Sequence, residues 1–382
     1  MPDSYTHVNI ALQALLRGGQ AVASLPCYIA GANGPDPFHM YQFWRRNRQP
    51  DLSALADRIH REQTGRFLAA MLDLAITPEQ QSYTMGFLTH YTTDCTLYPY
   101  IAALGDAGFF KGKRERLQFE ASIDSELFYG NYRTRTVPLY AATPMLLTDD
   151  LGQVTQLLHE SLLATYGVDI PVVDLADAFH DNVSVRKAMI SPRGVKKTWA
   201  KLVAPLRTGS KNAMPMLARF QPGKPLPPLP EKWKNPYSGE EMHLRFEEVI
   251  LLAEQTAAAA VVAAMRYWLG EIDGAKLLSI LGDNNYYTGQ PNPPPGTPAR
   301  ADAKPEKKDA LPERAAGGPA PAKQPPAPPT AAAIPSVKGA PPKTGYRPAA
   351  PVPHATKTQA PHIPPNQTTT QPPPPGGHTK GK

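Results

Sequence analysis

The sequence has very little cysteine: two residues, Cys27 and Cys95, in a chain of 382. A disulfide framework and a paired-cysteine motif both need more cysteines at short spacings, so both are excluded. We expect the two thiols to be small buried residues, because free cysteine is among the most buried residue types. Two cysteines also argue against a metal site made of thiolates alone.

Long apolar runs and a secretory leader are also missing. Residues 1–7 contain no basic stretch followed by an apolar core, so we expect no signal peptide. The most apolar stretch, residues 249–265, is interrupted by Glu254 and Gln255 and is predicted to be too short and too weakly apolar for a membrane span. The sequence therefore predicts a soluble, cytoplasmic protein with no transmembrane segment.

Acidic residues are scarce in one part of the chain only. Residues 291–382 contain 26 of the 45 prolines and have 12 Lys/Arg against 4 Asp/Glu, which leaves 28 against 29 for the rest. The pI of about 9.2 thus describes the C-terminal segment. The near-neutral remainder argues against a nucleic-acid groove.

We predict that residues 289–382 form a disordered, basic tail rich in Pro, Ala and Lys. Such a composition buries too little apolar surface to offset the entropy lost on ordering. A solubilising spacer is the simpler role for this tail, and weak binding to acidic partners or surfaces is the alternative.

Strand-like alternation is absent, and apolar residues recur instead at helical spacing. We predict irregular segments at residues 31–50 and 207–242 and helices at 8–16, 52–74, 78–98, 114–129, 151–166, 184–206, 240–269 and 275–281. Pro78 suits a first turn, and Pro99 is expected to end that helix. The sequence predicts one all-α domain at residues 1–288, with two packed subdomains as the alternative.

Residues 86–100 are the most informative segment, because they place His90 and Asp94 four residues apart in an apolar stretch. Residues i and i+4 share a helix face, so an imidazole and a carboxylate there can hold one divalent ion. Asp36 lies in a turn-rich segment upstream, and His60 lies between on a helix-like stretch. Two His and two Asp predict a site for zinc or a similar ion. The competing interpretation of His90 and Asp94 is a hydrogen-bonded buried pair.

Several motifs occur in an order that resembles a known family. They are Thr6-His7 before an apolar helix, Gly34-Pro35-Asp36, Arg58-Ile59-His60, and residues 86–94, 119–124, 233–239 and 286–289. This order is similar to that of the bacterial zinc-dependent phospholipase C family, clostridial members included, whose all-helical fold is shared with nucleases of the P1 type. The resemblance covers most of residues 1–290 and none of the tail.

The resemblance implies a role for each matching residue. It assigns Asp36, His60, His90 and Asp94 to a central zinc, with Asp36 also the general base, and it lets Asp94 bridge to a second zinc held by His7. In secreted relatives the amino group of the mature N-terminus also binds that second zinc, whereas here residues 1–6 precede His7. The implied activity is hydrolysis of a phosphodiester, such as that of a phospholipid headgroup.

Two positions depart from the family's pattern. Tyr98 precedes Pro99, and Arg116 lies four residues before Glu120, where the family usually has histidine at both places. A protonated arginine cannot ligate zinc, and tyrosine rarely does, so a further zinc site is predicted to be lost or remodelled, which leaves one or two zinc ions. Arg116 can pair with Glu120 or bind a phosphate oxygen. We interpret Glu120 and Asp124 as a polar helix face that can also contact the site.

Two functions stay open at the level of the sequence. The first is a zinc-dependent, phospholipase C-like phosphodiester hydrolase with a partly altered metal centre. The second is a non-catalytic metal-binding scaffold or interaction protein of the same fold, in which the tail is the interaction element. A nuclease has little support because the body is near neutral.

Overall fold

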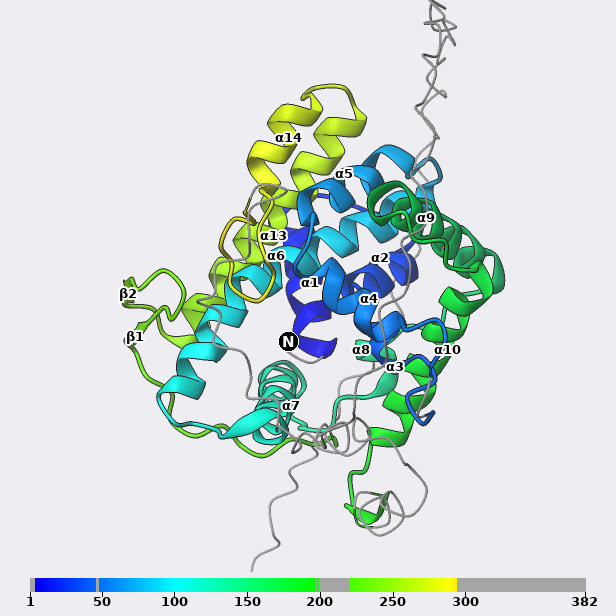
Figure 1. Ribbon diagram of the computed structural model, residues 1–382. Coiled ribbons are helices and arrows are strands. Elements are labelled where there is room, and N and C mark those ends of the chain that lie inside the picture. The colour runs from blue at the N-terminus through cyan, green and yellow to red at the C-terminus, as the bar shows by residue number, and fades with distance from the viewer. Residues whose placement is uncertain (1–3, 46–47, 197, 199–219, 294–382) are drawn as a thin grey trace, which may run out of the picture. The chain divides into compact units, whose positions relative to one another are not determined.

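Figure 1 shows the computed structural model of the chain. The structure describes residues 4–45, 48–196, 198 and 220–293. Its contacts separate Met1–Lys304 from Pro305–Lys382, and every described residue belongs to the first of these units. Residues 294–382 of the predicted tail lie outside the described residues, so the disorder and the binding partners of the tail stay predictions.

The described part of the chain is mostly helical, as the sequence predicts. Its helices are α1 (Ser4–Gly18), α2 (Leu25–Ala32), α3 (Asp36–Met40), α4 (Leu52–Ile59), α5 (Thr64–Leu74), α6 (Pro78–Asp106), α7 (Gly112–Tyr132), α8 (Leu139–Ala142), α9 (Thr148–Tyr166), α10 (Val172–Met189), α13 (Phe246–Trp268) and α14 (Gly274–Leu281). Two short strands, β1 (Trp233–Lys234) and β2 (Glu241–Met242), pair antiparallel in the predicted irregular segment. Strands of two residues are too short to produce a visible alternation in sequence.

Helix α6 lies at the centre of the described fold and packs against α2, α13 and α1 (Figure 1). It begins with Pro78 and a capping box in which Thr77 and Gln80 bond each other's backbone N–H groups. The helix continues through Pro99, where the sequence predicts its end. An interior proline costs about 3 kcal/mol, but burying one large apolar side chain contributes roughly 1.5–3 kcal/mol. Several such residues beside Pro99, including Tyr98 and Tyr100, are buried, so packing outweighs the local cost.

Two glycines let α2 and α6 cross at close range. A Cβ atom on Gly31 would lie 2.0 Å from the carbonyl oxygen of Tyr83, and one on Gly86 would lie 2.0 Å from that of Tyr28. Only glycine fits at either position, because any side chain would overlap the facing backbone. The crossing brings the end of α2, and the segment that follows it, against the middle of α6.

The predicted helix over residues 52–74 is two helices, α4 and α5. The break between them is held by tertiary hydrogen bonds: the carbonyl of His60 accepts from the N–H of Tyr286 at 2.9 Å, and that of Glu62 accepts from the hydroxyl of Tyr166 at 2.9 Å. Gln63 has a left-handed backbone (φ 51°). The apolar stripe of residues 52–74 predicts helix but contains no signal for these distant partners.

Other predicted boundaries also shift. The segment at 31–50, predicted to be irregular, contains the end of α2 and all of α3, which begins with Asp36-Pro37. Within the described residues, the predicted helix at 184–206 overlaps the end of α10 and the helical residues 195, 196 and 198, with a break between them. The helix predicted from residue 240 begins at Phe246, after β2. Helices as short as α3 carry less than two turns of periodic signal.

Helix α13 has 23 residues and is long and apolar enough to cross a membrane by length and composition, with a mean hydropathy of 1.6 over the tested window. This corrects the prediction that the segment is too short and too weakly apolar. More than half of that window, 56%, is buried inside the fold, where α13 packs against α1 and α6. A core helix meets the same criterion, so α13 is weak evidence for a membrane span. The predicted compartment stays a prediction.

Candidate metal centre

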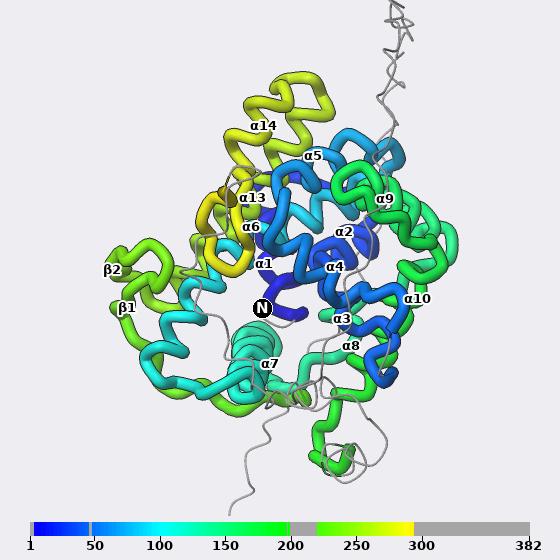
Figure 2. Tube along the Cα trace, in the orientation of Figure 1, coloured from blue at the N-terminus to red at the C-terminus, as the bar shows by residue number. Residues whose placement is uncertain are grey.

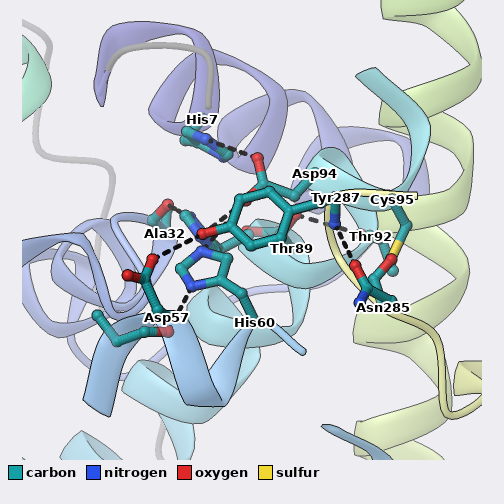
Figure 3. A network of polar contacts seen from close by, with 12 residues as sticks. His7, Ala32, Asp57, His60, Thr89, Thr92, Asp94, Cys95, Asn285 and Tyr287 are labelled. Atoms are coloured by element: carbon teal, nitrogen blue, oxygen red, sulfur yellow. Dashed lines mark hydrogen bonds and ion pairs between the residues drawn. The ribbon is translucent and has the colours of Figure 1, made fainter. Parts of the chain in front are cut away.

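Five residues singled out in the sequence meet inside the fold, and Figure 3 shows the surrounding polar network. One comes from α1, one is the first residue of α3, one is the C-cap of α4, and two lie on α6. Each of the five is 0–1% exposed. They are His7, Asp36, His60, His90 and Asp94.

Asp94 is surrounded by three imidazoles. Its Oδ1 lies 3.4 Å from Nε2 of His7. Its Oδ2 lies 3.5 Å from Nε2 of His60 and 3.3 Å from Nε2 of His90. The rings of His7 and His90 stack with their centroids 4.2 Å apart. The predicted shared face of His90 and Asp94 is confirmed, and each oxygen of Asp94 faces a different part of the centre.

The ligand atoms fall into two overlapping sets. One set is His7, His90 and Asp94, and the other is Asp36, His60 and His90. Within each set the nitrogen and oxygen atoms lie within 4.8 Å of one another. Three such atoms at this spacing can converge on one ion, so each buried group could hold a metal.

The inward polar atoms of these residues have no hydrogen-bond partner among the described residues. They are both ring nitrogens of His7, Nε2 of His60 and of His90, and both carboxylate oxygens of Asp36 and of Asp94. Each buried polar atom without a partner costs about 1–3 kcal/mol, and a charged one costs more. A bound cation would supply the partner that the chain lacks, and the donor set therefore fits a metal ion.

Backbone carbonyls orient two of the imidazoles. Nδ1 of His60 lies 2.7 Å from the carbonyl oxygen of Ala56, and Nδ1 of His90 lies 3.2 Å from that of Ala32. A carbonyl only accepts, so Nδ1 donates in both residues and the lone pair of Nε2 faces the centre. This outer contact is the usual one for metal-binding histidines.

Gly34 fixes the approach of the segment that presents Asp36. A Cβ atom on Gly34 would lie 2.3 Å from Cδ2 of His90, and the residue has φ +53°. Both the close contact and the backbone conformation require glycine. The chain between α2 and α3 thus lies flat against His90 and turns Asp36 toward the centre.

The electrostatics of the centre keep His7 and Asp94 in ligating forms. Burial, followed by the charge of His90, lowers the pKa of His7 well below its usual value. Burial alone would raise the pKa of Asp94, but the charge of His90 and the contact with His60 hold it well below its usual value. A neutral imidazole and an ionised carboxylate are the forms that bind metal ions. For His90, burial opposes protonation but Asp94 raises its pKa, so the proton on His90 competes with a metal.

Asp124 lies outside the centre and caps helix α1. Its carboxylate accepts hydrogen bonds from the N–H groups of Tyr5 and Thr6, both at 2.9 Å, and from the Thr6 hydroxyl at 2.6 Å. The interpretation of Asp124 as part of a polar helix face is corrected, because the residue is 2% exposed. Its contact with the site is indirect: it anchors the helix that carries His7.

Tyr98, Arg116 and Glu120 form a neighbouring group. Nε of Arg116 lies 3.4 Å from Oε1 of Glu120, and the Arg116 guanidinium lies 5.7 Å from the centroid of the Tyr98 ring. The predicted pairing of Arg116 with Glu120 is present. The polar-face interpretation of Glu120 is corrected, because the carboxylate is fully buried.

The segment that covers His60 has no role that the sequence predicts. The ring of Tyr287 stacks on His60 at 5.2 Å, and its hydroxyl donates to Oδ1 of Asp57 at 3.1 Å (Figure 3). The ring of Tyr286 contacts His60 edge-on at 4.8 Å. Both tyrosines belong to the motif at residues 286–289, so the sequence did contain a signal that could have pointed to them. The chain after α14 (yellow in Figure 2) returns to α6, where the Tyr91 hydroxyl accepts a hydrogen bond from the N–H of Asn284 at 3.1 Å.

No family model, curated protein or solved structure matches this chain. The resemblance to zinc-dependent phospholipase C enzymes therefore stays an interpretation of motif order. The geometry of the buried His/Asp groups carries the functional argument.

Proposed function

We propose that this chain is a zinc-dependent phosphodiester hydrolase of the phospholipase C type. The observation that carries the proposal is the convergence of five buried His and Asp side chains whose inward atoms have no partner among the described residues. Imidazole nitrogens and carboxylate oxygens are usual ligands of zinc in proteins.

Both ligand sets include His90, whose inward nitrogen can ligate only one ion, so a centre with two ions needs another shared ligand. Asp36, His60, His90 and Asp94 would hold the central zinc, and His7 would hold a second. The orientation of Asp94 supports a bridging role, because Oδ1 faces His7 while Oδ2 faces the other two imidazoles. One carboxylate between two ions is a recurrent feature of sites that cleave phosphate esters.

Zinc, when bound, supplies hydroxide at neutral pH by lowering the pKa of its water to about 7, and it neutralises phosphate charge. The chain contributes the positioning. Neither oxygen of Asp36 has a hydrogen-bond partner among the described residues, so one can ligate while the other accepts a proton from the attacking water. Tyr287 shields one face of His60 from solvent.

We propose a phospholipid headgroup diester as the substrate. The near-neutral composition of residues 1–290 supports a lipid over a nucleic acid, which would call for a strongly basic surface. A panel that includes a phosphatidylcholine vesicle, a small chromogenic diester and single-stranded DNA separates these substrates.

Metal content and hydrolysis measured on the same samples test the proposal. The full chain, purified without chelator, should contain about two zinc ions by mass spectrometry and cleave bis(p-nitrophenyl) phosphate. His90→Ala should lose zinc and hydrolysis together. His159→Ala is the matched control, because His159 bonds the carbonyl of Ile170 at 2.8 Å and belongs to neither ligand set. A wild-type chain without metal would overturn the proposal.

Burial of the centre supports a second candidate function, a non-catalytic scaffold. All five side chains are 0–1% exposed, and closed sites are typical of structural zinc, whereas catalytic zinc keeps an open position. One tightly bound ion that no diester or water can reach would favour the scaffold. Slow exchange of that ion and absence of hydrolysis are its expected signatures.

A further inference from the structure

Tyr98 lies one helical turn beyond Asp94 on α6. Residues four apart share a helix face, so Tyr98 continues the face that presents Asp94 to the centre. The side chain is 6% exposed, and no hydrogen bond joins its hydroxyl to another described residue. A phenol that close to a metal centre is a donor without an assigned acceptor.

Arg116 is held against this tyrosine from α7. Glu120, one turn further along α7, is fully buried, whereas the Arg116 side chain is 26% exposed. A buried carboxylate is costly unless a cation is fixed beside it, so the pair keeps the guanidinium in one place. The contact with Glu120 is at Nε.

The group lies against the metal centre. Burial raises the pKa of Tyr98, and the charges that act on it are those of Arg116, Glu120, Asp94 and Asp36. The Tyr98 ring is 4.8 Å from that of Tyr287, which stacks on His60. The Tyr98 ring therefore lies near both the Arg116 guanidinium and the ring that covers His60.

We propose that Tyr98 and Arg116 form an anion subsite that binds a non-bridging oxygen of the phosphate group held at the centre. The inference rests on the proposed function. Guanidinium and phenol donors match the acceptor oxygens of phosphate, and arginine suits them because its fork can donate two parallel hydrogen bonds. Glu120 is a positioning residue, because it acts through Arg116.

Phosphate affinity provides a test that does not depend on turnover. Inorganic phosphate is titrated by calorimetry into the full chain loaded with zinc and freed of unbound metal. Hydrogen bonds to charged groups contribute about 1.5–3 kcal/mol, so Arg116→Gln should weaken phosphate binding roughly tenfold or more while zinc content stays unchanged. Tyr98→Phe should weaken it less, and Arg116→Lys should restore part of the affinity because the charge returns without the fork.

Arg114→Gln is the matched control, because Arg114 is an exposed arginine on the same helix. Equal weakening in this control would overturn the subsite in favour of a general charge effect. Unchanged phosphate affinity in Arg116→Gln, with diester hydrolysis present in the wild type, would overturn the subsite and leave the hydrolase. A zinc-loaded wild type that neither binds phosphate nor cleaves diesters would overturn both. Tyr98→Phe keeps the test decisive if Arg116→Gln does not fold.

Discussion

Asp124 and Asp94 are both buried carboxylates that face residues of α1, and their surroundings differ. Asp124 accepts three hydrogen bonds of 2.6–2.9 Å from the first turn of α1. Asp94 has three imidazole nitrogens at 3.3–3.5 Å, and neither of its oxygens has a hydrogen-bond partner among the described residues. The chain itself satisfies the first carboxylate with hydrogen bonds, whereas the second has only the three imidazoles beside it and could take a metal ion as partner.

The largest expected effect is on metal binding at Asp94. Asp94→Ala removes the ligand shared by both proposed ions, so zinc affinity should fall by more than the roughly 10- to 100-fold that loss of an outer contact costs. Zinc titration with a competing chelator measures the change, with His159→Ala as the reference. If the Asp94→Ala chain keeps the wild-type zinc content, Asp94 does not bind the metal and does not differ from Asp124 in this respect.

Asp124→Ala should affect folding instead. The change leaves two N–H groups and a hydroxyl without an acceptor and removes the cap of α1, so we expect a loss of about 2–4 kcal/mol in the free energy of unfolding. Urea denaturation of the metal-free chain measures it. In the same experiment Asp94→Ala should also lose stability, because burial alone would raise the pKa of Asp94 but the charge of His90 holds it well below its usual value, and removing one partner of a buried charge pair is destabilising. Added zinc should stabilise the wild type and Asp124→Ala but not Asp94→Ala, and equal stabilisation of all three would contradict the comparison.

Gly34→Ala should displace the metal ligands beside it, His90 and Asp36, without replacing either side chain. It therefore sharpens the comparison between the centre around Asp94 and the cap formed by Asp124. The new Cβ would overlap His90, and the backbone has positive φ. We expect a loss of about 1–3 kcal/mol in stability and weaker zinc binding. Gly19→Ala is the matched control, because Gly19 has φ +59° and nothing within 4 Å of its Cβ position. If both variants lose zinc affinity equally, the contact with His90 is not the cause.

The smallest effect concerns Asp283, a third acid, which anchors the segment that leads to Tyr286. Burial would raise its pKa, but hydrogen bonds from Gly65, Thr64 and Asn292 lower it. A lowered folded pKa adds stability above the unfolded value of about 3.9, and that stability is lost as pH falls through the folded pKa. Asp283→Asn should therefore cost less than about 1 kcal/mol near pH 6, and the difference should vanish in acid. A pH-independent difference in unfolding free energy would show that charge is not involved.

Contacts within one element could be predicted from the sequence, whereas contacts between elements mostly could not. The spacing of His90 and Asp94 predicts their shared face, and motif order places Asp36 and His60 with them. The capping of α1 by Asp124 joins residues more than a hundred positions apart, and helical periodicity carries no information on such a pair. The sequence also predicts that α6 ends at Pro99, whereas the helix continues. Tertiary packing decides this outcome, and the local sequence does not contain it.

The segment that covers His60 has a consequence for how the protein is made. The ligands from His7 to Asp94 leave the ribosome first, and Tyr287 follows 193 residues after Asp94. At about 5–20 residues per second, this interval lasts roughly 10–40 s. During that time the nascent chain has every proposed ligand but lacks the ring that stacks on His60. Under the proposed function, a metal ion could reach His60 during this interval without passing the ring of Tyr287.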